Sequence, residues 1–574
     1  MDNSKLADTF EELAELLEFR GENPFRVRAY RNGAKAIREL DESVATILND
    51  PERSLADLPG IGSTLEEKSR TLIETGSLPQ LEELRKQVPE SVIAMTRIPG
   101  LGAKKAATLH TELGVESLDD LRKACEAGKV RKLKGFGAKT EALILAGLQI
   151  AQAANERVYW STADQLVASI TAHMKTCATI KRMEWAGSYR RGRETIGDLD
   201  LLVVADDREL AMDHFESYPE RTQTIARGEQ KKISIRVGKA FQVDMRLVDD
   251  GEFGAALQYF TGSKEHNVHV RRIASAKGLK INEYGVFRES DNAKIGGATE
   301  EEVYAAVGLP WIAPELREDR SEFALAERGA LPDLITESMM RGDLHMHTSA
   351  TDGTATIREM ADAAIARGLT YIAITDHSKR VSMANGLDAD RLRQQWKMID
   401  ELRDEYAGRL VILKGIECDI LEQGGMDLPD DCLAEADWVL ASVHYGQRQP
   451  REQITERILG AIANPHVDCI AHPTGRLINR REPYDVDMEA VMKAAAANST
   501  LLELNANPAR LDLNDIHLAT AKKLGIKFVI NTDAHSTEGL CVMRYGMMQA
   551  RRGGLTASDV VNTLDVKAFL KHVG

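Results

Sequence analysis

Paired cysteines and long apolar runs are both missing from this sequence of 574 residues. Its six cysteines are scattered and form no Cys-x-x-Cys pair, which argues against a disulfide framework and a thiolate zinc ribbon. No run approaches the roughly 18 apolar residues of a membrane span, and the first residues lead into an acidic stretch rather than a basic and then apolar one. We therefore expect a cytoplasmic protein with no membrane partner.

Proline is also scarce, with 16 residues, beside 43 glycines, 43% hydrophobic residues and 28% charged residues. These proportions lie near globular averages and exclude collagen-like and disordered classes. The length exceeds what a single hydrophobic core accommodates. The chain is therefore expected to fold as several domains.

Excess positive charge is absent too, because 74 basic residues face 89 acidic ones, a net charge of -15. Such a balance discourages nucleic-acid binding, which draws on lysine and arginine. The distribution weakens this objection, since the stretch 129–139 has no acid and five basic residues: Lys129, Arg131, Lys132, Lys134 and Lys139. Basic patches thus exist within an acidic average.

One short pattern recurs three times in the first 140 residues, each time before a helix-forming stretch. Its copies are Gly60-Ile-Gly62, Gly100-Leu-Gly102 and Gly135-Phe-Gly137. A Gly-x-Gly turn at a helix start directs backbone N–H groups at an anion and can hold a phosphate without reading a base. The alternative is that these are three ordinary turns that connect helices. The presence of three copies with matched flanking residues weakens that alternative.

The pattern resembles the helix-hairpin-helix motif, which binds the DNA backbone, and lysines such as Lys104 stand beside the loops. The amino-terminal region also resembles a 5'-deoxyribose-phosphate-binding domain. In that resemblance Lys68 aligns with a lysine that forms a Schiff base, although Arg26 and Thr64 replace its supporting lysines. An ordinary solvated surface lysine is an equally good reading of Lys68.

Three aspartates mark a mixed α/β region that runs from about Tyr159 to Val248. Asp198 and Asp200 lie two apart in a predicted strand and so share a face, where Asp244 of another predicted strand can meet them. Converging carboxylates repel one another unless divalent cations bind, which predicts Mg²⁺ or Mn²⁺. The alternative is a set of strand-end acids beside turns.

A glycine-bounded loop, Gly187-Ser-Tyr-Arg-Arg-Gly192, stands just upstream and offers a hydroxyl and guanidinium groups to a triphosphate. Together with Gly197-Asp-Leu-Asp200, it resembles the palm signature of family X DNA polymerases, small gap-filling repair enzymes. The resemblance implies two metals on the three aspartates and deoxynucleoside triphosphate binding. The residues it implicates around the nucleotide and template are Ser188, Arg191, Tyr259, Phe260, Gly262, Asn267 and Arg271. Lys264 departs from the family, because a vertebrate member has an acidic residue there.

In the carboxy-terminal third, apolar strand-like runs alternate with helical stretches, which predicts a parallel α/β barrel. Metal-ligand residues fall where these runs end, and strand ends converge on one rim of a barrel. Nitrogen and oxygen donors without cysteine suit Zn²⁺, Mn²⁺ or iron, and so many predict several ions. The residues are His345, His347, Asp352, His377, Glu417, His444, His472, Asp533 and His535.

These nine residues resemble the four motifs of the polymerase and histidinol phosphatase (PHP) domain. The resemblance implies a distorted barrel, a trinuclear metal centre, a phosphoesterase activity and Glu417 as a bridging ligand. Asp352 stands where some members have histidine.

The order of these parts resembles bacterial family X DNA polymerases over essentially the whole chain. We expect a multidomain α and α/β protein: helix-hairpin-helix domains, a mixed α/β nucleotidyltransferase palm, and a distorted (β/α)7 barrel. The expected boundaries are 1–85 for a lyase-like domain, 86–152 for fingers, 153–255 for the palm, 256–315 for a thumb, 316–338 for a linker and 339–574 for the PHP domain.

The expected function is the filling of short gaps in gapped or nicked duplex DNA by a monomer whose PHP domain is a metal-dependent 3'-5' exonuclease or phosphoesterase. For that domain the sequence leaves open an exonuclease, an abasic-site endonuclease or a 3'-phosphatase. A non-catalytic DNA-end-binding scaffold is one alternative, but it would tolerate loss of the metal ligands. A small-molecule phosphatase of the histidinol-phosphatase type is another, but it would leave the hairpins without a purpose.

Overall fold

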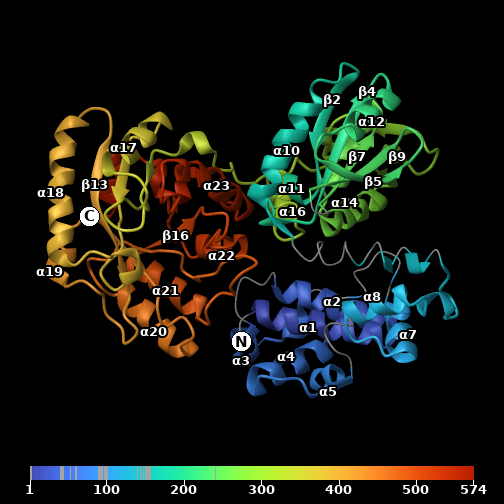
Figure 1. Ribbon diagram of the computed structural model, residues 1–574, viewed down its shortest axis with the longest axis horizontal. Helices are drawn as coiled ribbons and strands as arrows, with labels where there is room; N and C mark the ends of the chain where they lie inside the picture. Colours follow the sequence, from blue (N-terminus) through green and yellow to red (C-terminus); the bar gives the residue numbers. More distant parts are fainter. Residues whose placement is uncertain are drawn as a thin grey trace. The chain divides into compact units, whose positions relative to one another are not determined.

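The computed structural model describes residues 3–38, 44–51, 53–58, 61–87, 95, 101, 103–138, 140–142, 144–145, 148, 157–238 and 241–573. Two compact units are present, one of residues 1–157 with 237–241 and one of residues 158–236 with 242–574. Figure 1 traces the helical first unit in blue and cyan and the second from green to red. None of the described helices combines the length and the apolar character that a membrane crossing needs.

The first unit is helical and has one apolar cluster, which runs from Leu6 to Leu148. Its first helix shows why, because Leu6, Phe10, Leu13 and Leu17 recur every three or four residues and are all buried. The helices are α1 (Asn3–Phe19), α2 (Pro24–Arg38), α3 (Val44–Asn49), α4 (Ser63–Thr75), α5 (Pro79–Gln87), α7 (Ala103–Leu113) and α8 (Leu118–Glu126).

A five-stranded palm sheet opens the second unit, with strand order β2-β4-β7-β6-β5. Strand β4 alternates at its start, since Asp198 is exposed while Leu199 is buried, and it continues fully buried from Leu201 to Val204. The elements are β1 (Val158–Tyr159), α10 (Trp160–Met174), β2 (Ile180–Trp185), α11 (Gly187–Arg190), β3 (Thr195–Ile196), β4 (Asp198–Ala205), α12 (Arg208–Glu216), β5 (Arg221–Arg227), β6 (Lys232–Val237) and β7 (Phe241–Leu247).

A thumb segment follows, with a three-stranded antiparallel sheet and its own apolar cluster. Within the expected linker 316–338, helix α16 buries Phe323 and Ala326 in that cluster. The elements are α13 (Phe253–Thr261), α14 (Lys264–Ala276), β8 (Leu279–Asn282), β9 (Gly285–Arg288), β10 (Lys294–Gly296), α15 (Glu300–Ala306) and α16 (Glu322–Glu327).

The carboxy-terminal part is a parallel sheet of seven strands in sequence order, β11 to β17. A bridge between Met346 and Ala534, beyond β11 and β17, brings the last strand beside the first, so the barrel is nearly closed. This confirms the predicted seven-stranded barrel. The strands are β11 (Gly342–Asp343), β12 (Tyr371–Ile374), β13 (Val411–Asp419), β14 (Trp438–Ser442), β15 (Cys469–Ile470), β16 (Leu501–Asn505) and β17 (Phe528–Asn531).

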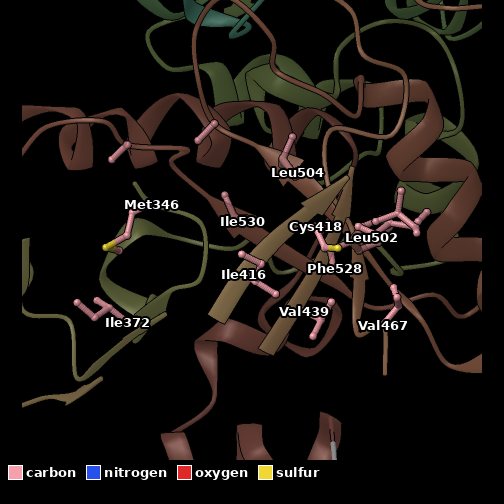
Figure 2. Packing of buried hydrophobic residues seen from close by; sticks show 14 of the residues in the cluster. Met346, Ile372, Ile416, Cys418, Val439, Val467, Leu502, Leu504, Phe528 and Ile530 are labelled. Carbon is pink, nitrogen blue, oxygen red and sulfur yellow. The ribbon is translucent and has the colours of Figure 1, made fainter. Parts of the chain in front are cut away.

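Barrel strands are buried on both faces, as expected of a parallel sheet between layers. In β12, Ile372 and Ile374 belong to the large apolar cluster while the alternate residues Tyr371 and Ala373 belong to a smaller one. Figure 2 shows part of the large cluster around β13. The helices are α17 (Ile357–Ala366), α18 (Ala389–Glu405), α19 (Asp430–Leu433), α20 (Arg451–Ile462), α21 (Met488–Asn498), α22 (Asp515–Lys523), α23 (Met543–Arg552) and α24 (Val566–Val573).

Candidate functional site

The nine predicted barrel ligands converge at one rim. Among the described residues, three groups of potential ligand atoms each lie within 4.8 Å. His472 joins them through Glu417, whose Oε1 lies 2.9 Å from His472 Nε2. The groups are His347, Asp352, His377 and His535, then His345, His347 and Asp533, then His377, Glu417 and His444.

Glu417 lies at the centre of this rim and is almost completely buried. It occupies β13, next to β12, and a single parallel bridge pairs it with His377. Its two carboxylate oxygens lie between 2.8 and 3.7 Å from ring nitrogens of five histidines, His345, His347, His377, His444 and His472. A carboxylate in this position can serve two ions at once.

The buried imidazoles provide the test of whether these residues fit metal ions. Nε2 of His345 and both ring nitrogens of His347 are buried and have no hydrogen-bond partner in the described structure. Buried polar atoms are rarely left without a partner, because the lost solvation costs free energy. Imidazole nitrogens and carboxylate oxygens, with no cysteine in any of the three groups of described residues, fit Zn²⁺, Mn²⁺ or iron.

The carboxylates make the centre of the rim favourable for positive charge. Burial lowers the pKa of His377, but Glu417 and Asp352 outweigh it and raise that pKa to about 10. Burial and the neighbouring His377 lower the pKa of His347 to about 4. The carboxylates therefore favour positive charge at this rim, and a metal ion bound there would take the place of the proton on His377.

Two further carboxylates orient the ligands, and the sequence analysis missed both. His345 Nδ1 lies 2.7 Å from Glu503 Oε1, and His444 Nδ1 lies 3.2 Å from Asp419 Oδ1. Both acids are fully buried. Such partners fix the tautomer and orientation of a metal-ligating ring. A charged residue inside the apolar run 501–504 was the available signal for Glu503, and the spacing of two from Glu417 was the signal for Asp419.

The three palm aspartates lie on one face of two neighbouring strands. Strands β4 and β7 are parallel and in a register that pairs Asp200 with Asp244, with Asp198 two residues away on the same face. Burial, Asp198 and Asp244 raise the pKa of Asp200 to about 6. Lys232 Nζ lies 2.5 Å from Asp244 Oδ2. Within the described palm, the three carboxylates do not meet within 4.8 Å.

The predicted phosphate-binding loop folds against these aspartates. Gly187 has a φ of +65°, and a Cβ there would lie 2.9 Å from Asp200 Oδ2, so only glycine fits. Ser188 follows in the short helix α11. Arg191 Nε lies 3.2 Å from Glu318 Oε1, and its Nη1 donates to the carbonyl of Thr261.

Helices α13 and α14 carry the other predicted nucleotide and template residues. The rings of Tyr259 and Phe260 meet edge to face, and Gly262 ends α13 with a φ of +68°. Asn267 is buried and donates to the carbonyl of Tyr259 at 2.7 Å. Arg271 donates to the carbonyl of Asn267 at 3.2 Å. In this structure, Asn267 supports the end of α13.

In the helical unit, Gly62 caps the start of α4, and Gly135 and Gly137 lie in a turn beside the exposed Lys134. Lys104 lies in α7. Gly60, Gly100, Gly102 and Lys139 lie outside the described residues.

Lys68 is half-buried in α4 and donates to Gln80 Oε1 at 2.9 Å. Burial, and then the charge of Arg26, lower the pKa of its amine. A lysine that forms a Schiff base must be deprotonated, so this environment suits the predicted role.

Models of five known families match consecutive parts of the chain. The two helical matches are a helix-hairpin-helix domain at residues 1–78 and a SAM-like helix-hairpin-helix tandem at 70–149. The DNA polymerase beta palm matches residues 157–236 and the DNA polymerase beta thumb residues 256–318. The PHP domain matches residues 343–507.

A relative in Bacillus subtilis (strain 168), the DNA polymerase/3'-5' exonuclease PolX, is 41% identical over 577 residues, covering 100% of both chains. DNA polymerase lambda of Rattus norvegicus is 25% identical over 351 residues, 55% of this chain and 56% of the relative. A probable phosphatase of Acetivibrio thermocellus is 35% identical over 203 residues, 34% of this chain and 78% of the relative. Because the full-length match joins the polymerase parts to the PHP barrel, the chain belongs to the family of PolX-type DNA polymerases.

Proposed function

We propose that this protein is a DNA polymerase that fills short gaps in duplex DNA and trims 3' ends with its barrel. The observation that carries the proposal is the coexistence of two separate sites, paired strand carboxylates in the palm sheet and nine converging ligands at the barrel rim. A DNA-end-binding scaffold would not need either site. A small-molecule phosphatase would need the barrel alone.

In the palm, Asp198, Asp200 and Asp244 would hold Mg²⁺ or Mn²⁺. When bound, such ions help to deprotonate the primer 3' hydroxyl and neutralise charge on the pyrophosphate. The primer oxygen forms a bond to the α-phosphorus as the bond to pyrophosphate breaks. Ser188 and Arg191 bind the triphosphate, Tyr259 and Phe260 face its sugar, and Arg271 contacts the template.

At the rim, the nine ligands would hold Zn²⁺, Mn²⁺ or iron, which supply an activated water for hydrolysis. Water attacks the terminal phosphodiester of the DNA, and the 3' oxygen of the preceding nucleotide leaves with a proton. Glu503 and Asp419 orient His345 and His444 for this task.

The helical unit binds the sugar-phosphate backbone of the DNA substrate. Its three Gly-x-Gly loops and Lys104 contact phosphates on both sides of the gap. The Lys68 amine forms a Schiff base with the 5'-deoxyribose phosphate and water is lost. β-Elimination then breaks the C3'–O bond, the downstream strand leaves with its 5' phosphate, and water releases the sugar from Lys68. We also propose that the protein is a monomer and lies in the cytoplasm. Light scattering after size-exclusion chromatography tests the oligomeric state.

A paired assay tests the proposal. Primer extension and 3'-end degradation are measured on gapped DNA with Mg²⁺ or Mn²⁺, beside hydrolysis of histidinol phosphate. We expect extension to the end of the gap and shortening of 3' ends. Abasic and 3'-phosphate substrates, assayed in parallel, identify which phosphoester the barrel prefers. Fast histidinol phosphate hydrolysis without activity on DNA would refute the proposal.

A further inference from the structure

Helix α23 of the barrel packs directly on the phosphate-binding loop of the palm. Arg552 Nη1 donates to the main-chain carbonyl of Arg191 at 2.8 Å, although the two residues are 361 positions apart. Beside it, a Cβ on Gly192 would lie 2.7 Å from Met548 Cε, so the methionine side chain closes over that glycine. The loop backbone is therefore held by a helix of the other domain.

The same arginine shares a carboxylate with Arg191. Glu318 Oε1 accepts from Arg552 Nη1 at 2.9 Å and from Arg191 Nε at 3.2 Å. Arg552 Nη2 also donates to Asp515 Oδ2 at 2.6 Å, and its side chain is only 2% exposed. Because Arg552 offsets part of the negative charge of Glu318, it weakens the hold of that carboxylate on Arg191.

A second contact with the barrel lies at Glu194, three residues after Arg191. Glu194 accepts from Gln549 of α23 at 2.7 Å and from Arg476 at 2.5 Å. This residue connects the loop to β3 and then to Asp198 of β4. The barrel thus fixes the segment at two points between the predicted triphosphate ligands and the first palm aspartate.

We propose that Arg552 is a positioning residue for nucleotide binding in the palm, acting through Arg191. The inference rests on the proposed contact of Arg191 with the triphosphate. Without Arg552, the carbonyl of Arg191 loses its donor and Glu318 binds Arg191 alone. The incoming nucleotide must then compete with Glu318 for the guanidinium.

The test is steady-state extension of a one-nucleotide gap by the full-length protein, with KM for the nucleotide and kcat measured separately. Arg552→Lys keeps the charge, but its compact ammonium replaces a planar fork whose two nitrogens reach Arg191, Glu318 and Asp515, so we expect KM to rise about tenfold. We expect kcat to change less than about twofold and degradation of single-stranded 3' ends to be unchanged. Met548→Ala leaves no buried charge unpaired and should raise KM in the same direction.

Arg551→Gln is the matched control, because Arg551 lies on the same helix and contacts Glu315 at 2.7 Å. It should leave KM unchanged. In the double variant Arg191→Ala, Arg552→Lys we expect no further rise beyond Arg191→Ala, since both act on one group.

The outcomes distinguish the positioning role of Arg552 from the proposed nucleotide contact of Arg191. A wild-type KM in folded Arg552→Lys and Met548→Ala proteins would overturn the inference, as would an equal rise in Arg551→Gln. If Arg552→Lys does not fold, Met548→Ala decides. An unchanged KM in Arg191→Ala would instead overturn the proposed nucleotide contact itself.

Discussion

At the scale of single residues, the position of Glu417 separates it from the other barrel ligands. Ring nitrogens of five histidines face its two oxygens, whereas His444 faces Glu417 from one side and Asp419 from the other. If ions are held here, loss of the central carboxylate would change the charge around each of them, whereas loss of a terminal imidazole would affect one.

We expect Glu417→Ala to lose more metal than His444→Ala and to abolish 3'-end degradation while sparing nucleotide addition. Bound metal per protein, measured by mass spectrometry, should fall by at least two ions in the first variant and about one in the second. A fully metallated and hydrolytically active Glu417→Ala protein would contradict the bridging role.

The palm aspartates lead to the complementary expectation. Asp244→Ala should lower nucleotide addition by about a thousandfold or more, because lost metal ligation removes several kcal/mol of transition-state stabilisation. Degradation of 3' ends should stay at the wild-type rate, since none of the nine rim ligands is altered. Loss of both activities in a folded variant would mean that the two sites are not independent.

At the scale of elements, the start of α4 offers a clean test of the phosphate-binding loops. Gly62 has a φ of -104°, which any residue adopts, and a Cβ there meets no atom within 4 Å. Gly135 has a φ of +87°, so a substitution there would strain the backbone as well. A substitution at Gly62 can therefore block phosphate binding without straining the backbone.

We expect Gly62→Val to weaken DNA binding about three- to tenfold, because its side chain lies where a phosphate would approach the N–H groups of the helix. The loss should be equal for gapped duplexes of unrelated sequence, since phosphate contacts carry no base information. Fluorescence anisotropy over a salt series measures it, and Gly62→Ala is the control with little added bulk. A loss confined to one sequence would favour base contacts instead.

Helix α15 begins with a buried carboxylate that joins palm and thumb. Glu300 accepts from Arg190 at 2.8 Å, from Arg317 at 2.6 Å and from Trp311 at 3.0 Å. Burial raises the pKa of Glu300, but the charges of Arg317 and Arg190 outweigh it and bring that pKa to about 2. The folded state therefore favours the ionised carboxylate.

Because this pKa lies below the ordinary value of 4.5, the stabilisation is complete above pH 4.5 and is lost as the pH falls toward 2. Glu300→Gln should lower the free energy of unfolding by about 3–5 kcal/mol at pH 7, since two arginines lose their shared partner. The difference from wild type should shrink in acid. Melting curves at pH 7 and at a pH between 4.5 and 2 test this, with Glu301→Gln at the neighbouring exposed position as the control. An equal difference at both pH values would argue against the ion pairs.

At the scale of the whole molecule, the sequence predicts those parts of the sites that follow from strand periodicity. Alternation placed Asp198 and Asp200 on one face, and apolar runs that end in histidines or acids located the rim. Glu503 was missed because it lies in the middle of β16, and Asp419 was missed because Glu417, two residues earlier, already stood for the end of β13. The contact of Arg552 with Arg191 follows no local pattern, because only the packing of two domains brings those residues together.

Between its first and last strands the barrel has a backbone bridge from Met346 to Ala534, and side-chain hydrogen bonds such as that from Thr532 Oγ1 to Asp343 Oδ2 at 2.5 Å support it. On either side of that bridge lie His345 and His347, which follow the first strand, and Asp533 and His535, which follow the last. Ions held by these residues would fasten the two edges together, so part of their binding energy becomes resistance to opening. Chelation should therefore speed amide hydrogen exchange first in residues 342–347 and 528–535, before the rest of the barrel loosens.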